Sequence, residues 1–158
     1  MDRRNKRLLP SPAGASGAAG RSRYLGTMSE ENVEIVRRVY SAFEQGDFWV
    51  PEYFDPNVRV IWLDVLGVKT ETVGLQAMSD VMRSWLQAFD LLTLTAERLI
   101  DAGDRVVVSA AWHGRGKASG ADTELRFGHV WSLRDGRVTG MIAYRELRQA
   151  LEAAGLSE

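Results

Sequence analysis

The sequence predicts an α+β domain over residues 28–158, with helices in its first half and antiparallel strands in its second. Apolar side chains recur at the helical period of about 3.6 residues in two early segments, and the period changes to about two after residue 90. Turn sequences then follow at regular spacing, around residues 101–104, 118–121 and 135–136. The 158-residue chain is 45% hydrophobic and has no internal repeat, which fits one domain with one core.

Residues 1–27 precede this domain as a basic extension rich in Pro, Gly, Ala and Ser. They hold six of the 20 basic residues and one of the 21 acidic residues. Residues 10–20 offer almost nothing to bury, and the apolar core of a secretory signal is missing. A nucleic-acid arm or a transit-like segment is the alternative. We expect a disordered, dispensable extension, with Met28 as the functional first residue.

Three helical segments are predicted in the first half of the domain. Ser29 suits an N-cap and Gly46 a C-terminal stop, and the apolar side chains between them fall on one helical face. The aromatic segment 47–54 is expected to form one or two turns. Residues 75–89 repeat the amphipathic pattern and form the next helix.

Five strands and a final helix complete the predicted order. A strand at 58–64 lies between the helical segments, with Val58, Val60 and Trp62 on one side. A short helix with apolar residues at helical spacing ends at Gly155. Four consecutive antiparallel strands precede that helix as a meander, at about 92–100, 105–116, 122–134 and 137–144.

Pairing these strands predicts one apolar, aromatic sheet face with a histidine in its middle. A two-residue turn at 135–136 sets His129 beside Ile142, and the preceding hairpin sets Ala110 on its other side. The reverse face is mixed in character, as a subunit interface often is. We expect a homodimer through its apolar residues Val107, Ala111, Val130, Met141 and Ala143.

Six segments stand out in this order of elements: MSEENV (28–33), FEQGD (43–47), WLQAFD (85–90), IDAGDRVVV (100–108), FGHVWSLRDG (127–136) and LEAAGL (151–156). Together they resemble the SnoaL-like branch of the nuclear transport factor 2-like superfamily. The likeness covers nearly all of residues 28–158, and it implies a cone-shaped, curved sheet (the first strand plus the four-stranded meander) packed with three helices around a pocket, usually as a homodimer. The superfamily includes ketosteroid isomerases, polyketide cyclases, epoxide hydrolases, dehydratases and non-catalytic modules, so it defines the fold more narrowly than the chemistry.

His129 and Asp64 are the candidate catalytic residues. In SnoaL-like polyketide cyclases an aspartate six residues before the Asp-Gly turn is the general acid/base, and the resemblance places His129 there. Histidine suits proton transfer near neutral pH, and an apolar pocket would lower its pKa and keep it available as a base. A core histidine satisfied by one hydrogen bond is the alternative. Asp64 would orient His129 or meet a substrate hydroxyl, unless it is solvated like most strand-end carboxylates.

Eight aromatic side chains are candidates for a substrate-binding wall. Two of them, Tyr40 and Tyr144, could also supply a pocket hydroxyl, which for Tyr40 follows from the resemblance to ketosteroid isomerases. The alternative is that these rings simply fill the core. The candidates are Tyr40, Trp49, Phe54, Trp62, Trp112, Phe127, Trp131 and Tyr144.

Composition and register exclude several classes of function. The chain has no cysteine, and the predicted register puts His113 and His129 on opposite sheet faces, so we expect no disulfide, no thiolate chemistry and no metal site. No apolar run approaches the roughly 20 residues that span a bilayer. We expect a cytoplasmic protein that binds neither membrane nor nucleic acid and needs no cofactor.

These observations together predict a protein with a pocket for a small apolar organic molecule. The first hypothesis is a cofactor-independent proton-transfer enzyme of cyclase, isomerase or hydrolase type, acting on a polyketide- or terpenoid-like substrate. The second is a non-catalytic carrier, and the third is a dimerisation module filled by its own aromatic side chains. An open pocket would argue against the third, and a polar partner of His129 would favour the first.

Overall fold

The computed structural model describes residues 17–65 and 68–156, with the backbone alone for residues 17–28, 64, 65 and 68. Its six-stranded sheet has the order β2-β1-β6-β5-β4-β3, in which β1 and β6 are parallel and the other neighbours antiparallel. The strands are Phe54–Val65, Val68–Val73, Phe89–Asp101, Arg105–Gly116, Asp122–Arg134 and Arg137–Tyr144 for β1 to β6. The helices are α1 (Gly17–Glu44), the 3-10 turn η1 (Pro51–Tyr53), α2 (Leu75–Ala88) and α3 (Leu147–Ala153).

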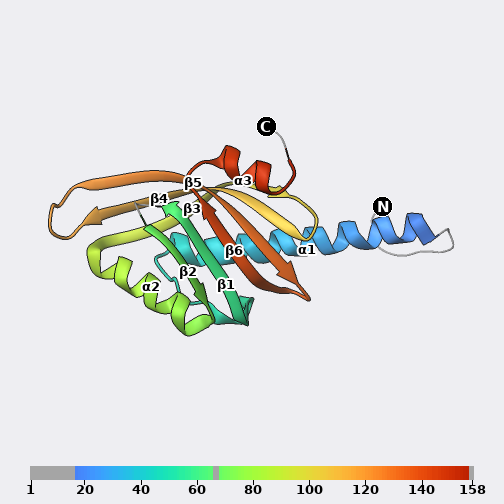
Figure 1. The fold of residues 1–158 in the computed structure, drawn as a ribbon, viewed down its shortest axis with the longest axis horizontal. Coiled ribbons are helices and arrows are strands. Elements are labelled where there is room, and N and C mark those ends of the chain that lie inside the picture. Colours follow the sequence, from blue (N-terminus) through green and yellow to red (C-terminus); the bar gives the residue numbers. More distant parts are fainter. Residues whose placement is uncertain (1–16, 66–67, 157–158) are drawn as a thin grey trace.

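The sheet curls, and the two longer helices lie against its inner face (Figure 1). Helix α1 crosses this face and packs mainly on β3, with Val36, Val39 and Tyr40 fully buried. Helix α2 contacts β1 and β2 near one edge of the sheet and also β3 at the other edge. Because one helix reaches both edges, the inner face is closed around a single main core. The predicted α+β class is confirmed.

Two parts of the predicted element order are wrong. Strand β2 was missed, because Val68–Val73 is a short edge strand whose charged Lys69 and Glu71 are typical of exposed sheet edges. Helix α1 begins at Gly17, so Ser29 lies inside it rather than at its N-cap. The backbone of residues 17–27 is therefore helical where we expected disorder, since alanine, leucine and arginine in this segment favour a helix once one is nucleated. Residues 1–16 lie outside the described residues.

The register around His129 also differs from the prediction. Its neighbours are Val108 on β4 and Ala143 on β6, in place of Ala110 and Ile142. The β4–β5 pairing is displaced by two residues from the predicted register. The last hydrogen bond of the hairpin, from Gly116 N to the Ala121 carbonyl oxygen at 3.1 Å, lies two residues earlier on β4 than predicted. A displacement of two keeps the faces unchanged.

The β5–β6 pairing changes by one residue over residues 140–144, which exchanges the faces of that part of β6, while Val138 stays in the main core. The tight turn at Asp135 and Gly136 is as predicted, with positive φ at both residues. An irregularity then follows between Ser132 and Leu133. As a result, Met141 and Ala143 point into the main core rather than to the reverse face.

Helix α3 covers the reverse face of the sheet at β4 and β5. Val107 and Val130 are buried there against the apolar side of α3, in a second cluster that also includes Tyr144. The apolar surface on which we based the homodimer is therefore mostly covered or turned inward. The homodimer itself stays a prediction. No helix in the part of the chain that the structure describes is long and apolar enough to cross a membrane.

Candidate functional site

An apolar cavity opens on the inner face of the sheet, between α1, α2 and the strands. Its volume, taken as the space that the centre of a water molecule can occupy, is about 60 Å³. One of its lining residues, His129, is titratable, and one other, Thr93, carries a hydroxyl. The remaining lining residues are apolar or aromatic: Phe43, Phe48, Phe54, Val60, Trp62, Met78, Met82, Trp85, Leu92, Leu94, Trp112, Phe127, Trp131 and Met141.

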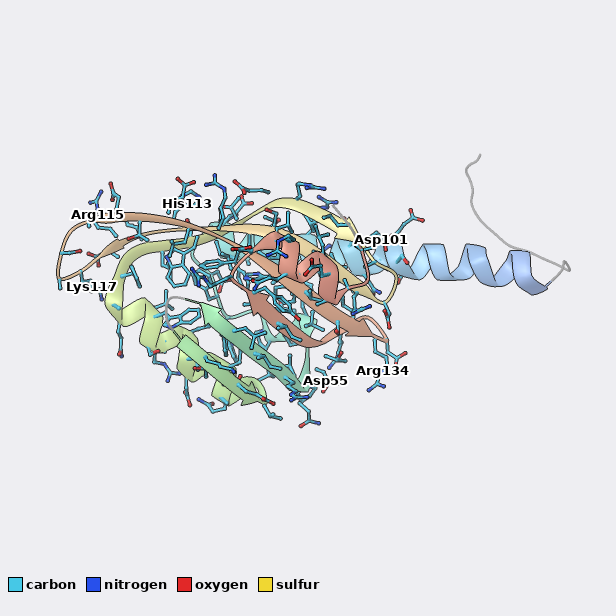
Figure 2. All side chains as sticks on the ribbon, turned by 45° about the horizontal axis from the view of Figure 1, so that its top comes forward. Asp55, Asp101, His113, Arg115, Lys117 and Arg134 are labelled. Atoms are coloured by element: carbon cyan, nitrogen blue, oxygen red, sulfur yellow. The ribbon has the colours of Figure 1, made fainter. Side chains whose placement is uncertain are left out.

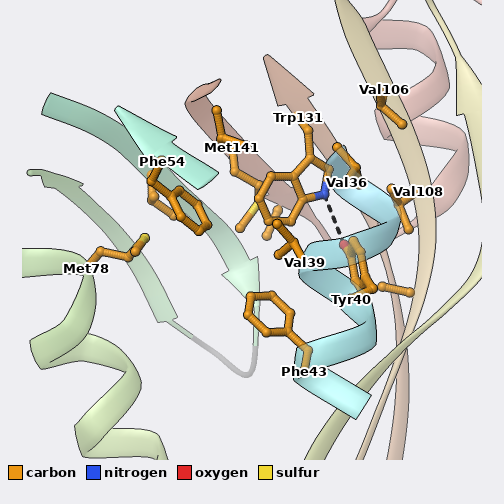
Figure 3. Close-up of a cluster of buried hydrophobic side chains, with 14 of the residues drawn as sticks. Val36, Val39, Tyr40, Phe43, Phe54, Met78, Val106, Val108, Trp131 and Met141 are labelled. Carbon is orange, nitrogen blue, oxygen red and sulfur yellow. Dashed lines mark hydrogen bonds between the residues drawn. The ribbon is translucent and has the colours of Figure 1, made fainter. Parts of the chain in front are cut away.

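His129 belongs to a buried hydrogen-bonded group with Tyr40 and Trp131. His129 and Trp131 are two residues apart on β5, so both side chains project from the inner face. Tyr40 comes from the buried side of α1, and its hydroxyl lies 2.5 Å from His129 Nδ1. Trp131 Nε1 donates to the same hydroxyl at 3.0 Å, the bond drawn in Figure 3. All three side chains are at most 4% exposed.

Burial decides the protonation of this group. Desolvation lowers the pKa of His129 to about 4, so the imidazole is neutral near pH 7. Burial also raises the pKa of the Tyr40 hydroxyl, which the hydrogen bond from Trp131 opposes only in part, so the phenol keeps its proton. The group therefore carries no net charge. The depressed histidine pKa agrees with the sequence argument.

Five of the eight predicted wall residues line the cavity, namely Phe54, Trp62, Trp112, Phe127 and Trp131. Tyr40 lies behind the wall, where it holds His129. Trp49 is 51% exposed and lies outside the cavity. Tyr144 packs on the reverse face near α3, because the β6 irregularity turned it outward. Asp64 belongs to β1, and its side chain lies outside the described residues.

The part of the wall that α2 contributes was not predicted from the sequence. Met78, Met82 and Trp85 come from the apolar face of α2, at spacings of four and three residues. That face was predicted, but periodicity cannot distinguish a face that lines a cavity from one that fills a core. Leu92 and Thr93 line the cavity from successive positions, next to Leu91 with its positive φ of 55°. Such a local irregularity leaves no clear signal in the sequence.

The second histidine lies on the opposite face of the sheet from the cavity. His113 is exposed near the β4–β5 hairpin, on the outside of the molecule, with Glu124 4.0 Å from its Nε2 (Figure 2). Among the residues that the structure describes, no group of three His, Cys, Asp or Glu side chains could hold a metal ion.

Solved structures of other proteins share this fold. An NTF2-like protein of unknown function from Burkholderia pseudomallei is 23% identical, with a TM-score of 0.65, and the match covers 77% of this chain and 95% of that one. A protein named as a SnoaL-like polyketide cyclase, from Jannaschia sp. CCS1, is 23% identical, with a TM-score of 0.63 and coverages of 79% and 91%. TerC, co-crystallised with polyporic acid, is 22% identical, with a TM-score of 0.62 and coverages of 79% and 98%.

At these identities the structural likeness shows the fold alone. No protein with a curated description matches the chain. The family model of the SnoaL-like domain matches residues 36–141, which extend from α1 to β6 and include Tyr40, His129 and Trp131. The chain therefore belongs to the family of SnoaL-like domains.

Proposed function

We propose that the domain binds a small apolar organic molecule in the cavity and that His129 contacts an oxygen of that molecule. The observation that carries this proposal is the lining itself, in which aromatic and aliphatic side chains surround one histidine. Pockets of this composition use their few polar groups to orient a ligand. With a cavity volume of about 60 Å³, a module filled by its own aromatic side chains stays an alternative.

As an enzyme, the domain would act on a polyketide- or terpenoid-like substrate without a cofactor, as a cyclase, isomerase or hydrolase. The name of the Jannaschia protein supports a polyketide-like substrate, and the polyporic acid co-crystallised with TerC supports a flat ring compound that carries oxygen. No carboxylate lines the cavity in the part of the chain that the structure describes. The proposed proton-transfer chemistry therefore rests on His129, which has the hydroxyl of Tyr40 as its partner.

A non-catalytic ligand carrier is the second candidate, and the protonation of the site favours it. A histidine with a pKa of about 4 takes up a proton only weakly at neutral pH, and its one polar partner is a phenol whose pKa is raised by burial. Such a pair orients a ligand well but accepts protons poorly. Turnover of a bound ligand distinguishes the enzyme from the carrier.

Binding can be tested with a matched pair of variants on α2. Met82 lines the cavity, whereas Leu86 lies one turn later, is 36% exposed and does not line it. Met82→Trp should fill part of the space and weaken binding of bicyclic aromatic ligands by roughly tenfold or more, while Leu86→Trp should leave it unchanged. Mass spectrometry of ligands that co-purify with the wild-type protein would identify the compound. Equal affinities in the two variants, or no binding of any ring compound, would refute the proposal.

A further inference from the structure

We infer that Tyr40 and Trp131 hold His129 in the tautomer with its proton on Nε2, so that the imidazole presents an N–H donor to the cavity and selects ligands with a carbonyl-type acceptor oxygen. This inference rests on the proposed function, because it concerns the ligand of the same cavity. It assigns Tyr40 and Trp131 as positioning residues for His129.

The direction of the hydrogen bonds begins at Trp131. An indole N–H can only donate, so the Tyr40 oxygen is the acceptor in the 3.0 Å bond from Trp131 Nε1. The Tyr40 hydroxyl keeps one proton to donate. Among the described residues, the one other polar atom bonded to this hydroxyl is His129 Nδ1, at 2.5 Å.

Two tautomers of neutral His129 then differ in how well they satisfy this group. With the proton on Nε2, Nδ1 accepts from Tyr40, and both the Tyr40 hydroxyl and the Trp131 N–H have partners. With the proton on Nδ1, both neighbours donate to the Tyr40 oxygen, and its hydroxyl proton has no acceptor in the described structure. An unsatisfied buried hydroxyl shifts such an equilibrium by roughly 5- to 150-fold, so the Nε2–H tautomer dominates.

The hydrogen bond to Tyr40 sets the orientation of the imidazole ring. The imidazole is stacked on Phe127 with an interplanar angle of 6°, and Trp131 meets it edge-on at 71°. Turning the ring by half a rotation would place a carbon against the Tyr40 hydroxyl and lose that bond. Tyr40 itself is 1% exposed and does not line the cavity, whereas His129 does. Nε2 is thus the ring nitrogen left for a ligand.

The chemical consequence is a change in the role predicted for His129. A base needs a free lone pair on Nε2, and this tautomer has none there. An N–H in an apolar wall favours a neutral ligand with an acceptor oxygen, such as a ketone or quinone on a flat ring system. A ligand that carries only N–H donors would place donor against donor. His129 would polarise a carbonyl rather than remove a proton.

Three ring compounds of nearly equal size separate these alternatives: indane has no polar group, 1-indanone has only an acceptor, and indole has only a donor. Dissociation constants of each compound are measured for wild type and for His129→Leu. For each protein, the dissociation constant of indane is divided by that of 1-indanone. Comparing this ratio between the two proteins removes the contribution of the different hydration of the ligands. The wild-type ratio should favour 1-indanone by roughly 3- to 10-fold more than the variant ratio. Indole should show no such advantage.

A direct reading of the tautomer comes from the ¹⁵N chemical shifts of the His129 ring in the wild-type protein at pH 7. We expect a protonated Nε2 and an unprotonated Nδ1. Tyr40→Phe should populate both tautomers of His129 and raise the affinity for indole relative to indane. The matched control Tyr53→Phe should change neither the tautomer nor this relative affinity. A protonated Nδ1 in wild type, or a preference of wild type for indole, overturns the inference. Failure of all three compounds to bind would instead refute the proposed function.

Discussion

Burial of an uncharged histidine predicts that the domain loses stability as the pH falls below about 6.5. The pKa of His129 is about 4 in the folded protein against 6.5 as its ordinary value. Between these values the unfolded chain binds the proton and the folded protein does not, so protons favour unfolding. The difference in pKa corresponds to a loss of roughly 3 kcal/mol in the free energy of unfolding. This loss is absent above pH 6.5 and complete below pH 4.

Urea unfolding followed by tryptophan fluorescence between pH 4 and 7.5 measures this effect. Carboxylates titrate in the same range, so the comparison with His129→Gln matters, because that variant keeps a hydrogen-bonding side chain without the titration. Wild type should lose roughly 2–3 kcal/mol more than His129→Gln over this range. His113→Gln, which removes the exposed histidine, should follow wild type. Parallel pH profiles for wild type and His129→Gln would refute the reasoning.

Four further outcomes are expected. Gly128→Ala should destabilise the domain by about 1–3 kcal/mol in urea unfolding, because the added Cβ would lie 2.8 Å from backbone atoms of residues 146 and 147 in and before α3; an unchanged midpoint would contradict the observed packing. Arg126→Ala should leave the urea midpoint nearly unchanged, since its ion pairs with Glu97 and Glu124 are solvent-exposed. Deletion of residues 1–27 should leave the melting temperature within error, and a drop of several degrees would count against this prediction. Sedimentation velocity at micromolar concentration should show a homodimer, and a monomer would count against that prediction.

Local pattern was enough to determine the order and type of most elements. A period of two from Phe127 to Trp131 put His129 on the aromatic face of its strand, whatever the neighbouring strand did. The Asp135-Gly136 pair determined a tight turn, because few other residues adopt positive φ at both positions. The absence of charge around His129 in that pattern was enough to predict the direction of its pKa shift.

Tertiary structure decided what lies beside each of these residues. One irregularity in the β5–β6 pairing turned Met141 inward and Tyr144 outward, and no local pattern marks it. The hydrogen bond between Tyr40 and His129 joins residues 89 positions apart. It depends on how α1 crosses the curled sheet, which is set by the packing of many side chains at once. The sequence therefore placed a histidine in an apolar wall, but the direction of its proton follows only from the neighbours that folding brought to it.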